Sequence, residues 1–208
     1  MAGRTPFSIR RHMDFSDLSL KRLSLDYRNI DYSHQISIHP YYSEFLTFFE
    51  DRDVIGYNDV IVAVHMVYGW MPTMLRLDTR EIDSILLLLN DIKDGGSPTL
   101  EDLMLLRGMM NNSMVGPSKL LHFIDPQRFA IWDSRIFRYI TGKVSQSQIA
   151  NAVNYFDYLE YINRLVLEPG FLPIHDHVRN KIGAIYTKLR TAEIVMFETD
   201  KLNGRRIT

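Results

Sequence analysis

The stretch MVGPSKLLHFIDPQRFAIWDSRIFRY, residues 114–139, decides the fold and the function that we expect of this chain. A Gly-Pro turn opens a short apolar helix, expected over residues 117–124, and Lys119 lies in its first turn. A loop then leads to Asp133 and to a second helix, expected over residues 134–140. The stretch therefore places one amine and one carboxylate at the starts of two successive helices.

The start of a helix is an unusual place for a lysine. Unpaired backbone N–H groups and the helix dipole put about half a positive charge there, which favours a phosphate or a neutral amine over a protonated one. The neutral amine is also the nucleophilic form, so Lys119 is a candidate nucleophile. A first-turn lysine that points into water is the alternative. Asp133 also has a structural alternative, as the N-cap of the following helix.

The same stretch carries a clear local charge. Between residues 117 and 143 there are five basic residues and two acidic ones, whereas the whole chain has a formal net charge of −1. A local basic patch is typical of a surface that contacts phosphates, although a solvated helix face gives a similar pattern. The basic residues are Lys119, Arg128, Arg135, Arg138 and Lys143.

Helical patterns dominate the 208 residues, without an internal repeat or a clear linker. We predict an all-α fold with one helical domain over residues 40–208, which can comprise two lobes. Residues 1–39 are polar and are expected to form an arm or a tail. Other helices are expected over residues 59–70, 79–94, 100–110, 145–167 and 178–196, and Thr99 with Asp102 resembles a capping box.

The composition excludes several classes of protein. Apolar residues make up 46% of the chain and charged residues 24%, an ordinary globular balance. There is no cysteine, which excludes disulfides, thiolate metal sites and iron–sulfur clusters. The longest apolar run, residues 85–89, is too short to cross a bilayer, and residues 1–17 lack the apolar core of a signal peptide.

The order of these features resembles the core of the helix-hairpin-helix DNA glycosylase superfamily, which includes endonuclease III-like and 8-oxoguanine glycosylases. In that superfamily a hairpin with a glycine-containing turn binds DNA phosphate. A lysine follows at the start of the second hairpin helix, and a loop leads to an aspartate at the head of the next helix. Here residues 103–110 resemble the first hairpin helix, SMVGPSKLLHFI (113–124) the turn and second helix, and DSRIFR (133–138) the segment that begins at the aspartate.

The resemblance implies a role for each matching residue. Lys119 would be the nucleophile that forms an imine with the sugar, and Asp133 would be the essential carboxylate. The hairpin and catalytic segment would cover about residues 100–142. Because Pro117 adds a position between the glycine and the lysine, Ser118 could occupy the usual place of the lysine. The DNA-contacting residues would be Gly116, Ser118, Arg135 and Arg138.

Excision requires that the base be flipped out of the duplex, and an aromatic or long apolar side chain can fill the gap or stack on the base. The candidates are Trp70, in the turn YGWMP, and Trp132, next to the aspartate. His122 lies on the same expected helix as Lys119, three positions along, and could face the same cleft. Packing in the core is the alternative for all three residues, and a phosphate contact is a further one for His122.

Neither a metal nor a cofactor is expected. His175 and His177 form an H-x-H pair after Pro173, but no third ligand stands at a convincing spacing. Asp176 is expected to cap the next helix instead.

We therefore expect a DNA glycosylase with AP-lyase activity that excises a damaged or modified base from duplex DNA. It would be a monomer that is cytoplasmic and associated with the nucleoid, or otherwise intracellular, and it would have no membrane partner. The alternative is a non-catalytic helical DNA-binding module, and a third possibility is a helical interaction protein without a nucleic-acid partner. Geometry separates the first two, because in a binding module Lys119 would point into solvent, with no base-sized pocket beside Asp133.

Overall fold

The computed structural model describes residues 13–32, 41–71, 73–183 and 186–205. These residues form α-helices and short 3-10 helices, and the only β-type contact within them is an isolated bridge between Leu77 and Met110. The prediction of an all-α fold is confirmed. None of the helices in this part of the chain is long and apolar enough to cross a membrane.

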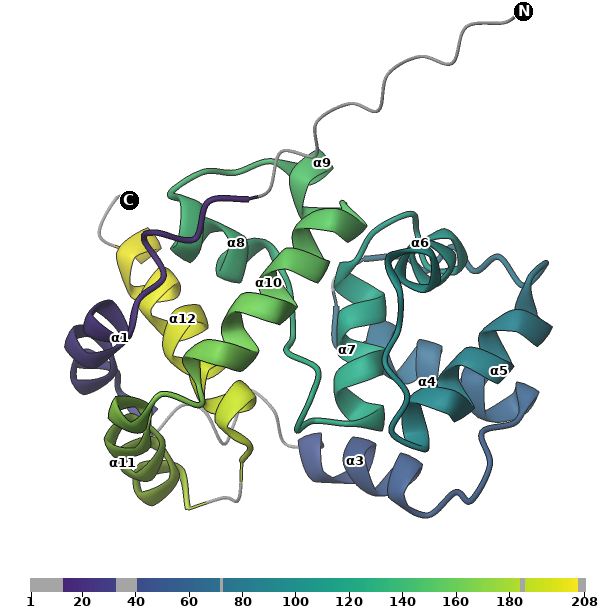
Figure 1. Cartoon of the computed structure of the whole chain (residues 1–208), viewed down its shortest axis with the longest axis horizontal. Coiled ribbons are helices and arrows are strands. Elements are labelled where there is room, and N and C mark those ends of the chain that lie inside the picture. Colours follow the sequence, from purple (N-terminus) through teal and green to yellow (C-terminus); the bar gives the residue numbers. More distant parts are fainter. Residues whose placement is uncertain (1–12, 33–40, 72, 184–185, 206–208) are drawn as a thin grey trace, which may run out of the picture.

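The first lobe surrounds a central helix, α7 (Val115–Ile124), and lies on the right of Figure 1. Eight of the ten residues of α7 are buried, because helices pack around it on several sides. Such a helix offers a rigid base for any side chain that it presents to a cavity. The helices around it are α3 (Tyr42–Glu50), α4 (Tyr57–Gly69), α5 (Ile82–Lys93) and α6 (Leu100–Met109).

The second lobe contains α8 (Ser134–Thr141) packed on α12 (Lys188–Arg205). It is seen on the left of Figure 1, where its helix α10 is on the side that faces the first lobe. Contacts between α10 and α6 join the two lobes. The remaining elements of this lobe are α9 (Gln146–Ile149), α10 (Ala152–Leu165), η3 (Pro169–Phe171) and α11 (Leu172–Ile182).

Part of the expected N-terminal arm also belongs to the second lobe. Residues 13–32 contain α1 (Leu20–Asp26) and η1 (Tyr27–Asn29), which contact α12. Leu18 and Leu23 are fully buried there, so this segment contributes to the core. Residues 1–12 and 33–39 of the expected arm lie outside the described part of the chain.

Several helix ends follow the local sequence. The Thr99 hydroxyl accepts the Asp102 N–H at 3.2 Å, and the Asp102 carboxylate accepts the Thr99 N–H at 2.8 Å. This reciprocal pair is the expected capping box. Gly142 ends α8 with a φ of 66°, in the left-handed region that glycine adopts easily.

The prediction of two long continuous helices, over residues 145–167 and 178–196, is wrong. Residues 145–167 form α9 and α10, which are separate because Asn151 caps α10 by accepting the Val153 N–H at 2.8 Å. Residues 178–196 are divided by Gly183, whose φ of 72° ends α11. Asp176 lies inside α11 and does not cap the next helix as expected.

Candidate active site

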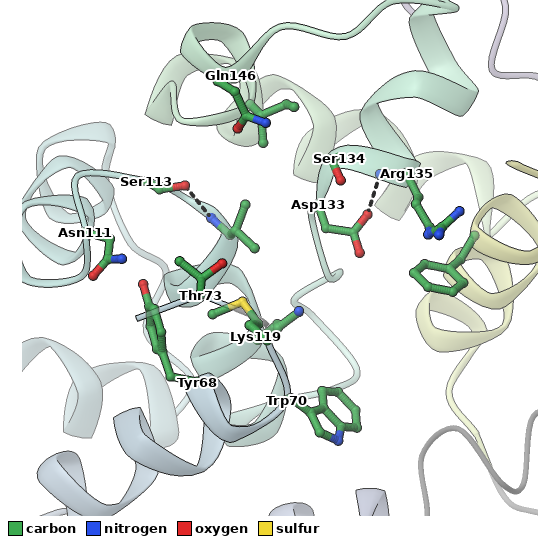
Figure 2. A pocket seen from close by; sticks show the side chains of 14 residues that line it. Tyr68, Trp70, Thr73, Asn111, Ser113, Lys119, Asp133, Ser134, Arg135 and Gln146 are labelled. Atoms are coloured by element: carbon green, nitrogen blue, oxygen red, sulfur yellow. Dashed lines mark hydrogen bonds between the residues drawn. The ribbon is translucent and has the colours of Figure 1, made fainter. Parts of the chain in front are cut away.

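A cavity of about 520 Å³ lies between the two lobes, within the range of roughly 300–1,000 Å³ that is usual for ligand pockets. Figure 2 shows Lys119 and Asp133 on its walls, contributed by different helices. From the first lobe it is lined mainly by Tyr68, Trp70, Asn111, Ser113, Val115 and Lys119. From the second lobe it is lined by Asp133, Ser134, Arg135, Gln146, Ile149 and Phe197.

Lys119 is buried in the first part of α7 and is only 8% exposed. Its amine points into the cavity, towards the side on which Asp133 and Trp70 lie (Figure 2). Burial lowers the pKa of Lys119, and the nearby Asp133 and Glu193 carboxylates oppose this shift only in part. A lowered pKa increases the fraction of neutral amine, which is the form that attacks a carbon centre.

Asp133 is the N-cap of α8. One of its carboxylate oxygens accepts the N–H groups of Arg135 at 2.9 Å and Ile136 at 3.0 Å. The structural role that the sequence offered for this residue is therefore present. Asp133 also lines the cavity together with Lys119. These hydrogen bonds fix the carboxylate at the cavity wall, so capping and a chemical role are compatible in the same residue.

Ser118 connects the two sides of this arrangement. It is fully buried, and its hydroxyl oxygen accepts the N–H of Trp132 at 3.0 Å. The carbonyl oxygen of Trp132 lies 3.1 Å from the same hydroxyl. Ser118 was predicted to contact DNA, but its burial excludes a direct contact in this conformation. Instead, Ser118, which precedes Lys119, is hydrogen-bonded to Trp132, which precedes Asp133.

A smaller cavity of about 180 Å³ adjoins these residues and is lined by Trp70, Lys119, Ile131, Asp133, Arg190, Glu193 and Phe197. Arg190 and Glu193, both on α12, form a buried ion pair and are 1% and 4% exposed. Burial raises the pKa of Glu193 to about 7, although Arg190 acts in the opposite direction. The smaller cavity thus combines aromatic walls with three ionisable side chains close to Lys119.

Gly116 lies inside the first turn of α7 and is buried. A Cβ atom there would come within 2.9 Å of the Met110 side chain and 3.0 Å of the Tyr68 ring, so the glycine allows close packing. The left-handed residues in the turn before α7 are Asn111 and Asn112, with φ values of 56° and 51°. Gly116 is therefore not presented at the surface as a phosphate-binding glycine of the predicted hairpin would be.

Arg135 and Arg138, the other predicted DNA contacts, differ in their surroundings. Both pair with the buried Asp200 of α12. The Nε of Arg138 donates to Asp200 at 2.7 Å, whereas Arg135 approaches it only at 3.3 Å. Arg135 also lines the larger cavity. Arg135 is therefore the better placed of the two for a phosphate.

The three aromatic candidates differ in whether they reach the cavities. Trp70 lines both cavities. Trp132 is fully buried, and its indole N–H donates to the Ile149 carbonyl at 2.9 Å, so it packs in the core and cannot act as a wedge in this conformation. His122 is also fully buried. Its ring nitrogens lie 2.7 Å from the Phe129 carbonyl and 2.7 Å from the Tyr42 hydroxyl, and burial lowers its pKa to about 3. It is a neutral core residue.

The histidine pair has structural contacts. His175 lies 2.8 Å from the Thr191 hydroxyl, and the His177 ring packs edge-on against Tyr27. Within the described ranges, no group of three or more His, Cys, Asp or Glu residues is placed to hold a metal ion.

Sequence reasoning missed several residues of the site, namely Tyr68, Arg190, Glu193 and Phe197. A signal for two of them was present. Arg190 and Glu193 stand three positions apart in LRTAEIVMF, a largely apolar run, and charges within such a run indicate a buried pair or a functional site.

No protein-family model, curated protein or solved structure matches this chain.

Proposed function

We propose that this protein is a DNA glycosylase with AP-lyase activity, in which Lys119 is the nucleophile and Asp133 the carboxylate that stabilises the transition state. The observation that carries the proposal is the buried lysine, with a lowered pKa, on the wall of a cavity that it shares with an aspartate fixed at a helix N-terminus. A lysine in the first turn of a helix that has no chemical role would more often point into water.

The chemistry uses both side chains. The bond between C1′ and the base breaks, its electron pair leaves with the base, and positive charge develops on the sugar. The Asp133 carboxylate stabilises that charge. The neutral amine of Lys119 bonds to C1′ and loses a proton, and opening of the sugar ring gives the imine. The imine acidifies the C2′ hydrogen, so that β-elimination can cleave the strand.

A non-catalytic DNA-binding module is the second candidate. It predicts a solvent-exposed Lys119 with no pocket beside Asp133. The burial of Lys119 and the two cavities that it shares with Asp133 support the catalytic function over this alternative. The basic residues of the segment 117–143 are compatible with either function, since both require phosphate contacts.

The test is to incubate the protein with a duplex that contains one abasic site, add borohydride and separate the products on a denaturing gel. Reduction converts an imine into a stable covalent adduct. The wild type should give an adduct and Lys119→Gln should give none. Lys143→Gln is the matched control, because Lys143 is an exposed lysine of the same basic segment, and its adduct yield should equal that of the wild type.

Failure of the wild type to form an adduct, although it binds the duplex, would contradict the lysine chemistry and favour the binding module. Equal adduct yields in the wild type and in Lys119→Gln would refute the assignment of the nucleophile. A melting temperature for each variant separates loss of chemistry from loss of folding.

A further inference from the structure

Arg190 has hydrogen-bonding capacity that the described part of the protein does not use. The side chain is 1% exposed, and one of its terminal nitrogens pairs with Glu193. Its Nε and its other terminal nitrogen, Nη2, are buried and have no hydrogen-bond partner among the described residues. A buried donor without a partner costs about 1–3 kcal/mol, so such a group calls for an explanation.

The position of Arg190 suggests what its partner is. Arg190 lines the smaller cavity, together with Lys119 and Asp133. Its guanidinium carbon lies 5.8 Å from the centre of the Trp70 ring and 4.9 Å from that of Tyr42, so aromatic rings hold it in place. A ligand in this cavity would lie beside both proposed catalytic groups.

The size and walls of the cavity suit a planar ring. Its volume of about 180 Å³ is comparable to the roughly 150 Å³ of an engineered protein cavity that binds benzene. Trp70 and Phe197 line both this cavity and the larger one, and aromatic side chains are the usual stacking partners of an extruded base. A larger base could extend from one cavity into the other.

We infer that the smaller cavity is the base-recognition subsite and that Arg190 recognises a base with two adjacent hydrogen-bond acceptors on one edge. The inference rests on the proposed glycosylase function. Nε and Nη2 of a guanidinium form a fork whose two hydrogens match two neighbouring acceptors. The O6 and N7 atoms of a guanine-type base provide such an edge, and the O2 and N3 atoms of a cytosine-type base provide another.

Glu193 supports the same assignment. Its carboxylate accepts a hydrogen bond from Nη1, the third nitrogen of the Arg190 guanidinium. This leaves the fork of Nε and Nη2 for the ligand. Burial raises the pKa of its carboxyl group, and the paired Arg190 acts in the opposite direction. Because Glu193 also lines the smaller cavity, its carboxylate can accept a hydrogen bond from a base N–H.

The experiment compares the affinity of the protein for duplexes that differ by one acceptor atom. One pair carries guanine or 7-deazaguanine, in which a C–H group replaces N7, and the other carries cytosine or 3-deazacytosine. Each base stands opposite a mismatched adenine, which lowers the cost of extrusion. We expect the missing acceptor to weaken binding by about tenfold in one of the two pairs. The pair that responds identifies the edge that is read.

Arg190→Met should remove this difference in affinity, and it should also slow borohydride trapping on an abasic site, because the charge of Arg190 helps to lower the pKa of Lys119. An arginine with only a structural role would lower the overall affinity but leave the preference within the responding pair of duplexes unchanged. If Arg190→Met does not fold, Arg190→Lys serves as the second variant. It retains the positive charge beside Glu193 but lacks the fork, and it should also lose the preference.

Equal affinities of the wild type within both pairs would overturn the inference. Ordered water would then be the partner of Nε and Nη2 of Arg190. A preference that persists in both Arg190 variants would also overturn it. The outcome is distinguishable from failure of the proposed function. A wild type that prefers one base but forms no imine refutes the lysine chemistry alone, and one that forms an imine without any preference refutes the recognition subsite alone.

Discussion

The hydroxyl group of Ser118 is hydrogen-bonded to the backbone of Trp132, at 3.0 Å from its nitrogen and 3.1 Å from its oxygen. Each of these residues immediately precedes a proposed catalytic residue, Lys119 or Asp133. The contact therefore fixes the start of α7 against the residue that leads into α8. Because all of its atoms are buried, this link between the two walls of the cavity is shielded from water.

Ser118→Ala removes this link. We expect a loss of about 1–3 kcal/mol in the free energy of unfolding, because the Trp132 N–H is left buried without its acceptor. We also expect slower imine formation at saturating DNA, with an affinity for abasic DNA close to that of the wild type, because the change alters the relative positions of Lys119 and Asp133. Ser84→Ala, at an exposed serine of α5, is the control. A Ser118→Ala protein with unchanged stability and rate would show that the link is unimportant.

Asp133→Asn separates the two roles of this residue. Asparagine is as good an N-cap as aspartate, so the melting temperature should stay close to that of the wild type. The rate of base release should fall by about 10²–10³ because the negative charge is lost. Asp133→Ala should show the same loss of rate and an additional destabilisation of about 1 kcal/mol. A rate of Asp133→Asn within a few-fold of the wild type would mean that the residue is only a cap.

Substitutions of Arg135 and Arg138 should affect different properties, so each serves as the control for the other. Arg135→Gln should weaken DNA binding and reduce the slope of log affinity against log salt by about one, as expected for loss of one phosphate contact. Arg138→Gln should mainly lower the melting temperature, because Arg138 provides the closer partner of the buried Asp200. Affinity measured over a series of salt concentrations distinguishes the two. The opposite assignment of the two effects would contradict the placement of Arg135 at the DNA surface.

Glu193→Gln should change how stability depends on pH. The folded state raises the pKa of Glu193 from 4.5 to about 7, so between these values it binds more protons than the unfolded state. The stability of the wild type relative to Glu193→Gln should therefore fall as the pH rises from about 4.5 to 7, by at most about 3.4 kcal/mol. Denaturant unfolding at several pH values measures the difference. Glu160→Gln, at an exposed glutamate, should give a flat difference, and a flat curve for Glu193→Gln would contradict the raised pKa.

The part of the fold that the sequence predicted is the part governed by local interactions. The capping box at Thr99, the N-cap at Asp133 and the stop at Gly142 each depend on residues within one helical turn. Local patterns did not predict the break at Gly183, because a glycine within an amphipathic pattern is compatible both with a continuous helix and with a helix end.

The candidate site could be predicted only in part, for a related reason. Lys119 and Asp133 belong to one continuous segment, whereas Arg190 and Glu193 reach the same cavity from α12, late in the chain. Their position depends on how α12 packs on α8, which no local pattern specifies. Trp132 and His122 show the opposite error, since nearness in sequence to the site did not place them in it.

The most direct test of the central claim is to locate the adduct within the chain. The borohydride-trapped complex is digested with nuclease and protease, and mass spectrometry identifies the residue that carries the sugar remnant. We predict a modified Lys119, in a peptide that is absent from the Lys119→Gln protein. A remnant on another lysine or on the N-terminal amine, with Lys119 unmodified, would contradict the account.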